Sequence, residues 1–429
     1  MSPSLPTNDA RVRPGPQDPA PRFADPGLPP EQAGVRAYVG GQAILEGVMM
    51  RAPRALAVCV RRPDGSLVLR ETPWVPLFAR WPLVKRPFAR GAAVMIESMW
   101  NGLSALNFSA RVAELDAHAH AHAHAHARDA TRGARPADAT AAPDTAALGA
   151  LALEAESPES RRARAASMAL AAAIAIALFV GLPHALAAFG GAWLGGGDAP
   201  TAADARSVSF HVLDGAFKLA IFVGYIALVR RIPEIRRVFQ YHGAEHKAVT
   251  TYEERRPLTV DGARPFGTFH ARCGTSFVLF VLVVSIVLFA TVLPALPPVS
   301  DAPLVQHLFL VVIKLPLMIP VAGVAYELNR FAAEHPRLAL VQALVTPGRW
   351  MQRLTTAAPT DDQVEVALTA LRAALAGEAE AARGGAPPAG VQTLRDFTQV
   401  EARWPATPSS PARVAAIGAL LLVAAPPLP

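Results

Sequence analysis

The sequence predicts a mainly α-helical, polytopic membrane protein with about four transmembrane helices and a small cytoplasmic β-hairpin module near the N-terminus. Hydrophobic residues make up 52% of the chain and are concentrated between about residues 166 and 327. Four apolar stretches in that region are long enough to cross the roughly 30 Å of hydrocarbon in a bilayer. Basic residues flank these stretches and aromatic residues make up only 7% of the chain, so the net charge of +7 indicates a membrane protein and excludes a nucleic-acid-binding one.

The segments at the two ends and before the first span have low complexity. Residues 1–34 are rich in proline and lack an apolar segment, so we expect a disordered N-terminus without a cleavable signal peptide. Residues 111–165 contain histidines that alternate with alanine from His118 to His126, and we interpret this segment as an inserted linker with no fixed metal geometry. Residues 377–429 are rich in alanine, proline and glycine and are expected to form a disordered tail.

Residues 35–110 are expected to form the cytoplasmic module. Residues 55–61 and 66–71 alternate apolar and polar side chains around a Pro-Asp-Gly turn, which is typical of a β-hairpin. Residues 87–106 have helical periodicity but contain Arg90 and Glu97. We therefore expect an interfacial or re-entrant helix there and not a fifth span.

The membrane domain is expected to cover residues 166–376, with a cytoplasmic central loop and a C-terminal helix that begins at a capping box of Thr360 and Gln363. Arginine and lysine residues precede the first span, follow the fourth and fill the loop between the second and third, whereas the connection between the first and second carries only Arg206. This asymmetry predicts the cytoplasmic membrane as the location, with both termini in the cytoplasm. The predicted spans are residues 166–189, 208–229, 274–294 and 304–326.

The central loop carries the strongest candidates for chemistry. Pro233 can start a helix, on which His242 and His246 share the apolar face that also contains Glu253. Two imidazoles at positions i and i+4 are spaced to bind one cation, and Glu245 between them gives the H-x-x-E-H order of inverted zinc metallopeptidases, in which glutamate is the general base. The alternative is a pair of histidines that hydrogen-bond inside a packed helix interface.

His270 and Cys273 stand immediately before the third span in H-x-x-C spacing. Together with the helical pair, they would complete a four-ligand site that suits a divalent metal, zinc best of all. If all four bind, the site is closed, as is typical of a structural metal. If His270 or Cys273 stays off the metal, a position is open for water or substrate, as catalysis requires. A buried cysteine at a helix start is the plain alternative for Cys273.

Three further features are weaker on their own. Gln42 and Glu46 follow a Gly-Gly pair near the N-terminus, and Glu327 stands at the inner end of the fourth span, at the predicted depth of the histidines. Ionisable residues inside the spans indicate either an ion pair that packs helices or a polar path through the membrane. These residues are Asp214, Lys218 and Lys314.

Five motifs in order resemble the YqhQ-like family of bacterial membrane proteins, a domain of unknown function described as a predicted metal-dependent enzyme. The motifs are YVGGQAILEGVMMR, FQYHGAEHK, HARCGTSF, AGVAYELNR and LTTAAPTDDQVEVAL. The resemblance covers residues 37–110 and 160–376, with the histidine–alanine insertion between them. It points to His242, Glu245, His246, His270 and Cys273, and adds weight to Gly40, Gly41, Gln42, Glu46 and Glu327.

Together these observations predict an integral membrane protein with a metal site on the cytoplasmic side, acting as a metal-dependent hydrolase on a membrane-proximal lipid or peptide. The rival hypothesis is a non-catalytic membrane scaffold or assembly factor, held together by a structural metal or a hydrogen-bonded histidine cluster. Transport along a path near Lys218 and Lys314 ranks third.

Overall fold

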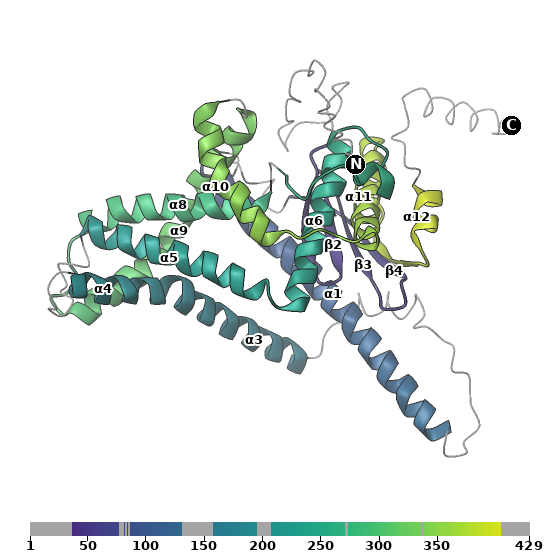
Figure 1. The fold of residues 1–429 in the computed structure, drawn as a ribbon, viewed down its shortest axis with the longest axis horizontal. Coiled ribbons are helices and arrows are strands. Elements are labelled where there is room, and N and C mark those ends of the chain that lie inside the picture. Colours follow the sequence, from purple (N-terminus) through teal and green to yellow (C-terminus); the bar gives the residue numbers. More distant parts are fainter. Residues whose placement is uncertain are drawn as a thin grey trace, which may run out of the picture.

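The computed structural model describes residues 37–404 except for 77–80, 82–83, 85, 131–157, 195–206, 271–272 and 336–337. Residues 1–36, which include the predicted disordered N-terminus, residues 131–157 of the predicted linker, and the end of the tail lie outside the described residues. Figure 1 shows long helices gathered at one end of the molecule and a β-sheet with its covering helices at the other.

The predicted hairpin is confirmed and belongs to a larger sheet. β3 and β4 pair antiparallel, with Arg61 opposite Leu67 at the turn, and the sheet order is β1-β2-β3-β4-β5. Apolar residues occupy every position of β3 up to the last, because this strand is buried on both faces. The strands are β1 (Gly40–Ile44), β2 (Gly47–Arg51), β3 (Ala55–Arg61), β4 (Leu67–Pro73) and β5 (Gly390–Leu394).

Helices cover both faces of this sheet. On one face, α6 (Pro233–Glu253) and α11 (Asp361–Ala382) form a core with the strands, in which Tyr241 and Leu368 are fully buried. On the other face, α1 (Ala89–Ala130) packs Phe108 and its neighbours on the strands. The sheet is therefore an internal layer that fixes α6, the predicted histidine helix.

Two expectations differ from the structure. The predicted linker is not irregular at its start, because α1 continues through residues 111–130 and Val112 in this part packs on the sheet. The segment expected to be an interfacial or re-entrant helix forms the first part of α1, and its place relative to a membrane stays a prediction. The tail from residue 377 is not disordered throughout: it completes α11 and adds β5 and α12 (Phe397–Arg403). β5 forms because it pairs with the edge of β4, and Asp396 accepts a hydrogen bond from the backbone of Gln399 to cap α12.

Within the part of the chain that the structure describes, four helical segments are long and apolar enough to cross a membrane, as predicted: Ala165–Gly190, Val208–Val229, Phe277–Ala295 and Pro303–Ala332. The first span is built from α3 (Pro158–Ile176), a π-helical turn (Ala177–Gly181) and α4 (Leu182–Leu194). The other helices are α5 (Val208–Val229), α7 (Val260–Ala263), α8 (Gly274–Val292) with a short 3₁₀ turn (Leu293–Ala295), α9 (Pro303–Glu334) and α10 (Ala339–Thr355).

The ionisable residues inside the spans form one buried cluster. Asp214 lies 2.6 Å from the Lys314 ammonium and 3.7 Å from that of Lys218, so one carboxylate faces both lysines. His184 accepts a hydrogen bond from Lys314 at 3.1 Å. These contacts join three spans through polar groups, the helix-packing role expected of charges buried away from lipid.

The chain path brings the sheet and the histidine helix to the same end of the spans. α6 connects α5 to α8, and α11 follows α10 after the last span, and both pack on the sheet. Figure 1 shows this end beside α10. The sequence predicts it to be the cytoplasmic end.

Candidate metal centre

α6 carries the central residues of the site. The helix begins with Pro233 in its first turn and packs an apolar stripe on the sheet, in which Ala244 and Ala248 are fully buried. Gly243 lies against the segment after α10: a Cβ atom there would be 2.2 Å from the carbonyl oxygen of Ala357. The glycine of the HGAEH motif therefore allows the histidine helix to approach that segment closely.

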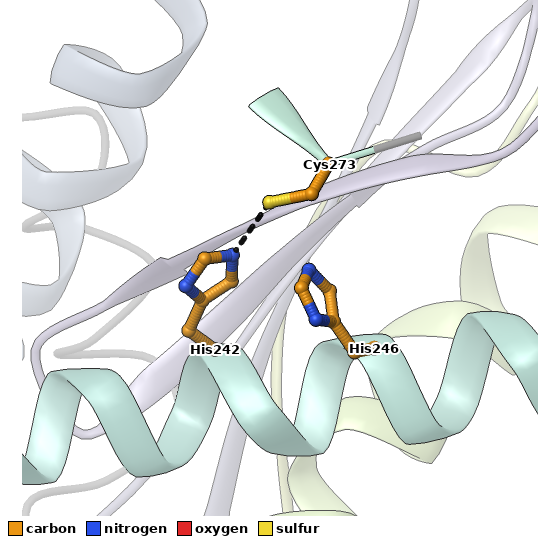
Figure 2. Close-up of side chains that lie close together, drawn as sticks. All are labelled: His242, His246 and Cys273. Atoms are coloured by element: carbon orange, nitrogen blue, oxygen red, sulfur yellow. Dashed lines mark hydrogen bonds between the residues drawn. The ribbon is translucent and has the colours of Figure 1, made fainter. Parts of the chain in front are cut away.

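Three predicted ligands come together. Figure 2 shows His242 and His246 on successive turns of α6, with Cys273 above them from the segment that enters α8. The His242 Nε2 atom is 3.2 Å from the Cys273 Sγ atom. One ligand atom from each of the three residues lies within 4.8 Å of the others. This compactness is what a single metal ion requires.

Two backbone carbonyls fix the orientation of both imidazoles. The Nδ1 atom of His242 lies 2.8 Å from the carbonyl oxygen of Thr355, and that of His246 lies 2.6 Å from the carbonyl oxygen of Thr268. Because a carbonyl only accepts, each Nδ1 carries a proton, and in the neutral imidazole the lone pair is then on Nε2. Histidine ligands of metals are commonly held in this way.

The surroundings of His246 give a second indication of a bound metal ion. Its ring is buried, and its Nε2 atom has no hydrogen-bond partner among the described residues. A buried polar atom without a partner is costly and needs an explanation. A metal ion next to His242 and Cys273 would supply that partner.

Glu245 lies beside the three ligands. Its Oε2 atom is 3.8 Å from the Nε2 atom of His242, and the side chain is largely buried. The other side of Glu245 rests on β1, where a Cβ atom on Gly41 would be only 2.6 Å from its Cγ atom. Gly41, the second residue of a Gly-Gly pair that is a weak signal in the sequence, therefore gives the carboxylate room next to the cluster.

His270 is close to the cluster but has a different partner. Its Nε2 atom lies 3.1 Å from the Oε2 atom of Glu253, and its ring centroid is 5.7 Å from that of His246. Burial lowers the pKa of His270, which favours the neutral imidazole. Gln352 holds the backbone of His270 through both its N–H and its C=O. His270 and Glu253 thus form a pair at the edge of the three-residue cluster.

Glu46 lies outside the cluster, in the turn between β1 and β2. Its carboxylate binds the Arg237 guanidinium at 2.6 and 2.5 Å, and it accepts a hydrogen bond from the Tyr241 hydroxyl at 3.2 Å. Burial is the main cause of a raised pKa at Tyr241, so the hydroxyl stays protonated and donates. Glu46 thereby joins the sheet to α6, one turn before His242.

Gln42 and Glu327 also join elements. The Gln42 amide lies 3.4 Å from the carbonyl oxygen of Ser98, between β1 and α1. Glu327 forms an ion pair with Arg90 at 2.7 and 2.5 Å, between α9 and the start of α1. The structure therefore places both residues at contacts of α1 and not in the cluster.

Sequence patterns could not find several parts of the site. The carbonyls of Thr268 and Thr355 orient the histidines through backbone atoms, which leave no signature in side-chain chemistry. Gln352 is one polar residue on an amphipathic helix, and only its contacts with His270 reveal its role. Pairing of distant segments, and not spacing along the chain, creates these contacts.

Comparison with known proteins agrees with the motifs. Residues 86–377 match the family described as "Protein of unknown function (DUF1385)". The chain belongs to this family. It is also similar to the "Uncharacterized protein YqhQ" of Bacillus subtilis (strain 168), with 30% identity over 330 residues, which cover 77% of this chain and 89% of the relative. The expected YqhQ-like membership is thus confirmed, and no solved structure matches the chain significantly.

The DUF1385 match includes every residue of the three-ligand cluster, together with Glu245 and the His270–Glu253 pair. The strands β1 to β4 precede the matched residues. Because the family description assigns no activity, the chemistry has to be argued from the cluster itself.

Proposed function

We propose that this DUF1385 member is a membrane-embedded, metal-dependent hydrolase with a divalent metal, best suited to be zinc, bound by His242, His246 and Cys273. The observation that carries the proposal is the fixed orientation of the two imidazoles. Each donates its Nδ1 proton to a backbone carbonyl and turns its Nε2 atom toward the cysteine sulfur. Two imidazoles and a thiol form a borderline-soft donor set that favours zinc over magnesium or calcium.

The number of ligands favours catalysis over a purely structural metal. Structural zinc sites commonly use four protein ligands, whereas catalytic sites use three and keep one position for water or substrate. His270 would be the fourth ligand of a closed site, and it is bonded to Glu253 instead. When bound, the metal would act as a Lewis acid and lower the pKa of water.

Glu245 is the residue for proton transfer in this proposal. Its carboxylate lies 3.8 Å from the Nε2 atom of His242, close enough to reach a group at the metal position. Contact with β1 restricts its movement on the opposite side. The His270–Glu253 pair lies next to the same position and orients the segment that carries Cys273.

The location of the site favours a substrate at the membrane surface. Cys273 immediately precedes α8, a helix that is long and apolar enough to cross a membrane. The arginine-rich connections at this end support a cytoplasmic orientation. A membrane-proximal lipid or peptide is the substrate class that fits this place.

Metal content of the purified protein tests the proposal. The full chain would be purified in detergent with His118, His120, His122, His124 and His126 replaced by alanine, so that the repeat cannot bind adventitious metal. We expect about one zinc per chain, lost in a variant that carries both His242→Ala and His246→Ala. His335→Ala is the matched control, because His335 is exposed and lies outside the cluster.

Glu245→Gln separates a hydrolase from a scaffold. A hydrolase variant should keep its zinc and lose turnover, whereas a scaffold variant should keep both its zinc and its biological role. A chain that holds no metal in any variant would contradict the proposal. The 3.2 Å contact between His242 and Cys273 would then be a hydrogen bond that only ties α6 to α8.

A further inference from the structure

A pocket of about 580 Å³ lies beside the metal centre, at the membrane end of α5 and along α10. Its charged lining residues are Arg230, Arg349 and Arg353, and no acidic residue is among the described residues that line it. Such a concentration of positive charge attracts an anion. Guanidinium groups bind phosphate through paired hydrogen bonds.

Local contacts hold the wall of this arginine pocket in place. The Arg230 side chain donates a hydrogen bond to the backbone carbonyl of Arg353, and the Arg349 guanidinium lies over the Phe269 ring at 4.7 Å. The pocket also shares Thr268 with the metal centre, since the carbonyl of this residue orients His246.

An apolar groove of about 350 Å³ adjoins the arginine pocket. Its lining residues are Leu279, Phe280 and Val283 from α8, and Ala343, Val345, Pro347 and Gly348 from α10. The two cavities meet on α10, because Pro347 and Gly348 line the groove while the residues on either side line the pocket. The groove therefore starts where the positive charge ends.

The groove faces the hydrocarbon part of a membrane. It lies on α8, whose residues from Phe277 form a candidate span, and Val283 is 45% exposed. Trp350 lines the neighbouring pocket and is 63% exposed, in the position at which tryptophan marks a membrane interface. An occupant of both cavities must be charged at one end and apolar along the other.

We infer that the arginine pocket and the α8–α10 groove together bind one membrane lipid, with its phosphate headgroup among the arginines and a hydrocarbon chain in the groove. A soluble phosphate would leave the groove unused. An acidic peptide would have to place its backbone polar groups in the apolar groove, where they cannot be hydrogen-bonded. This binding site lies outside the set of metal ligands, and its occupancy does not require the proposed hydrolysis.

The test measures binding of a fluorescent long-chain phosphatidic acid to the detergent-purified full chain. Arg349→Ala combined with Arg353→Ala should weaken binding at least about tenfold, because two charge-assisted contacts are lost. Arg231→Ala combined with Arg236→Ala is the matched control: it removes the same charge from exposed positions outside the pocket and should change affinity less than about twofold. Equal weakening in both pairs would mean general surface attraction and would overturn the inference.

Competition experiments test the two parts of the site. Excess glycerol phosphate, which lacks a chain, and diacylglycerol, which lacks a phosphate, should each compete poorly with the labelled lipid. If glycerol phosphate competed as well as the complete lipid, the apolar groove would not contribute to binding. If diacylglycerol did so, the arginine pocket would not contribute. Ala343→Phe, at an exposed groove position, should weaken binding of the long-chain lipid without changing the melting temperature.

The metal-site variant separates this inference from the proposed function. A chain with His242→Ala and His246→Ala should lose zinc but still bind the labelled lipid through the three arginines. Failure of lipid binding in an otherwise folded, zinc-loaded chain would overturn the lipid site alone.

Discussion

Substitution of Gly243 by alanine should weaken metal binding indirectly, by displacing the segment that orients His242. The new Cβ atom would lie 2.2 Å from the Ala357 carbonyl oxygen and 3.0 Å from the Thr268 Cγ2 atom. Ordinary contacts begin at 3.4 Å, so α6 and residue 357 must separate by about 1.2 Å. A side chain could not absorb this shift, because the obstacle is backbone, and the amide of Ala357 is itself bonded to the Phe239 carbonyl at 2.9 Å.

This separation has two calculable consequences. Overpacking of this kind costs about 1–3 kcal/mol of folding free energy. Thr355 lies two residues before Ala357, and its carbonyl holds the His242 Nδ1 atom at 2.8 Å. Loss of such an orienting contact typically weakens metal binding about 10- to 100-fold. Zinc affinity should therefore fall even in the population that remains folded.

The assay compares Gly243→Ala with Gly224→Ala, a second glycine inside a helix. A Cβ atom at Gly224 meets nothing within 4 Å, so this control should bind zinc normally. Zinc affinity would be measured by competition with a chromophoric chelator, and stability by thermal unfolding in the same detergent. A Gly243→Ala chain with wild-type zinc affinity would refute the argument that the Thr355 segment holds the ligand in place.

Three further predictions concern the sheet and its covering helices. The Arg62 guanidinium binds Asp116 at 2.8 and 2.5 Å, and both side chains are buried. Asp116→Ala should therefore lower the free energy of unfolding by about 3 kcal/mol. This is the lower end of the range for buried pairs, because Asp64 remains 3.6 Å from Arg62. Thermal unfolding of this variant, compared with one in which both partners are apolar, would show whether the unpaired arginine causes the loss. Burial raises the pKa of the Cys59 thiol to about 12, so iodoacetamide should leave it unmodified until the chain unfolds, and labelling of the folded chain at Cys59 would contradict its burial. Burial also raises the pKa of Glu71, so the folded state favours the protonated acid: stability is fully present below the ordinary pKa of 4.5 and falls as the pH rises through the raised value. Glu71→Gln should therefore raise the melting temperature at neutral pH and not at acidic pH, and a pH-independent difference would contradict this sign.

The parts of the fold that depend on local pattern were predictable. Each span carries its hydropathy within one continuous stretch, and the β3–β4 hairpin consists of two short apolar segments on either side of one tight turn. The pairing of β4 with β5 was not predictable, because the two strands lie near opposite ends of the chain. The β5 sequence Gly-Val-Gln-Thr-Leu has no strong strand pattern by itself, and the partner edge supplies the missing stabilisation.

The site shows the same division between local and distant information. Spacing on one helix was enough to place His242 and His246 on a common face, since the geometry of an α-helix fixes that relation. Spacing could not decide between Cys273 and His270, which are three residues apart in the sequence. The fold directs Cys273 to the histidines and His270 to Glu253.

The contacts of the cluster imply that a metal would stabilise more than one helix. The ligands come from α6 and from the entrance of α8, and the carbonyls that orient them come from Thr268 before α8 and Thr355 at the end of α10. Glu245 extends the same set of contacts to β1 through Gly41. A metal at this position would therefore connect the sheet, the central helix and the membrane ends of two further helices, so its removal should loosen the junction between the sheet and the spans while each part keeps its own core.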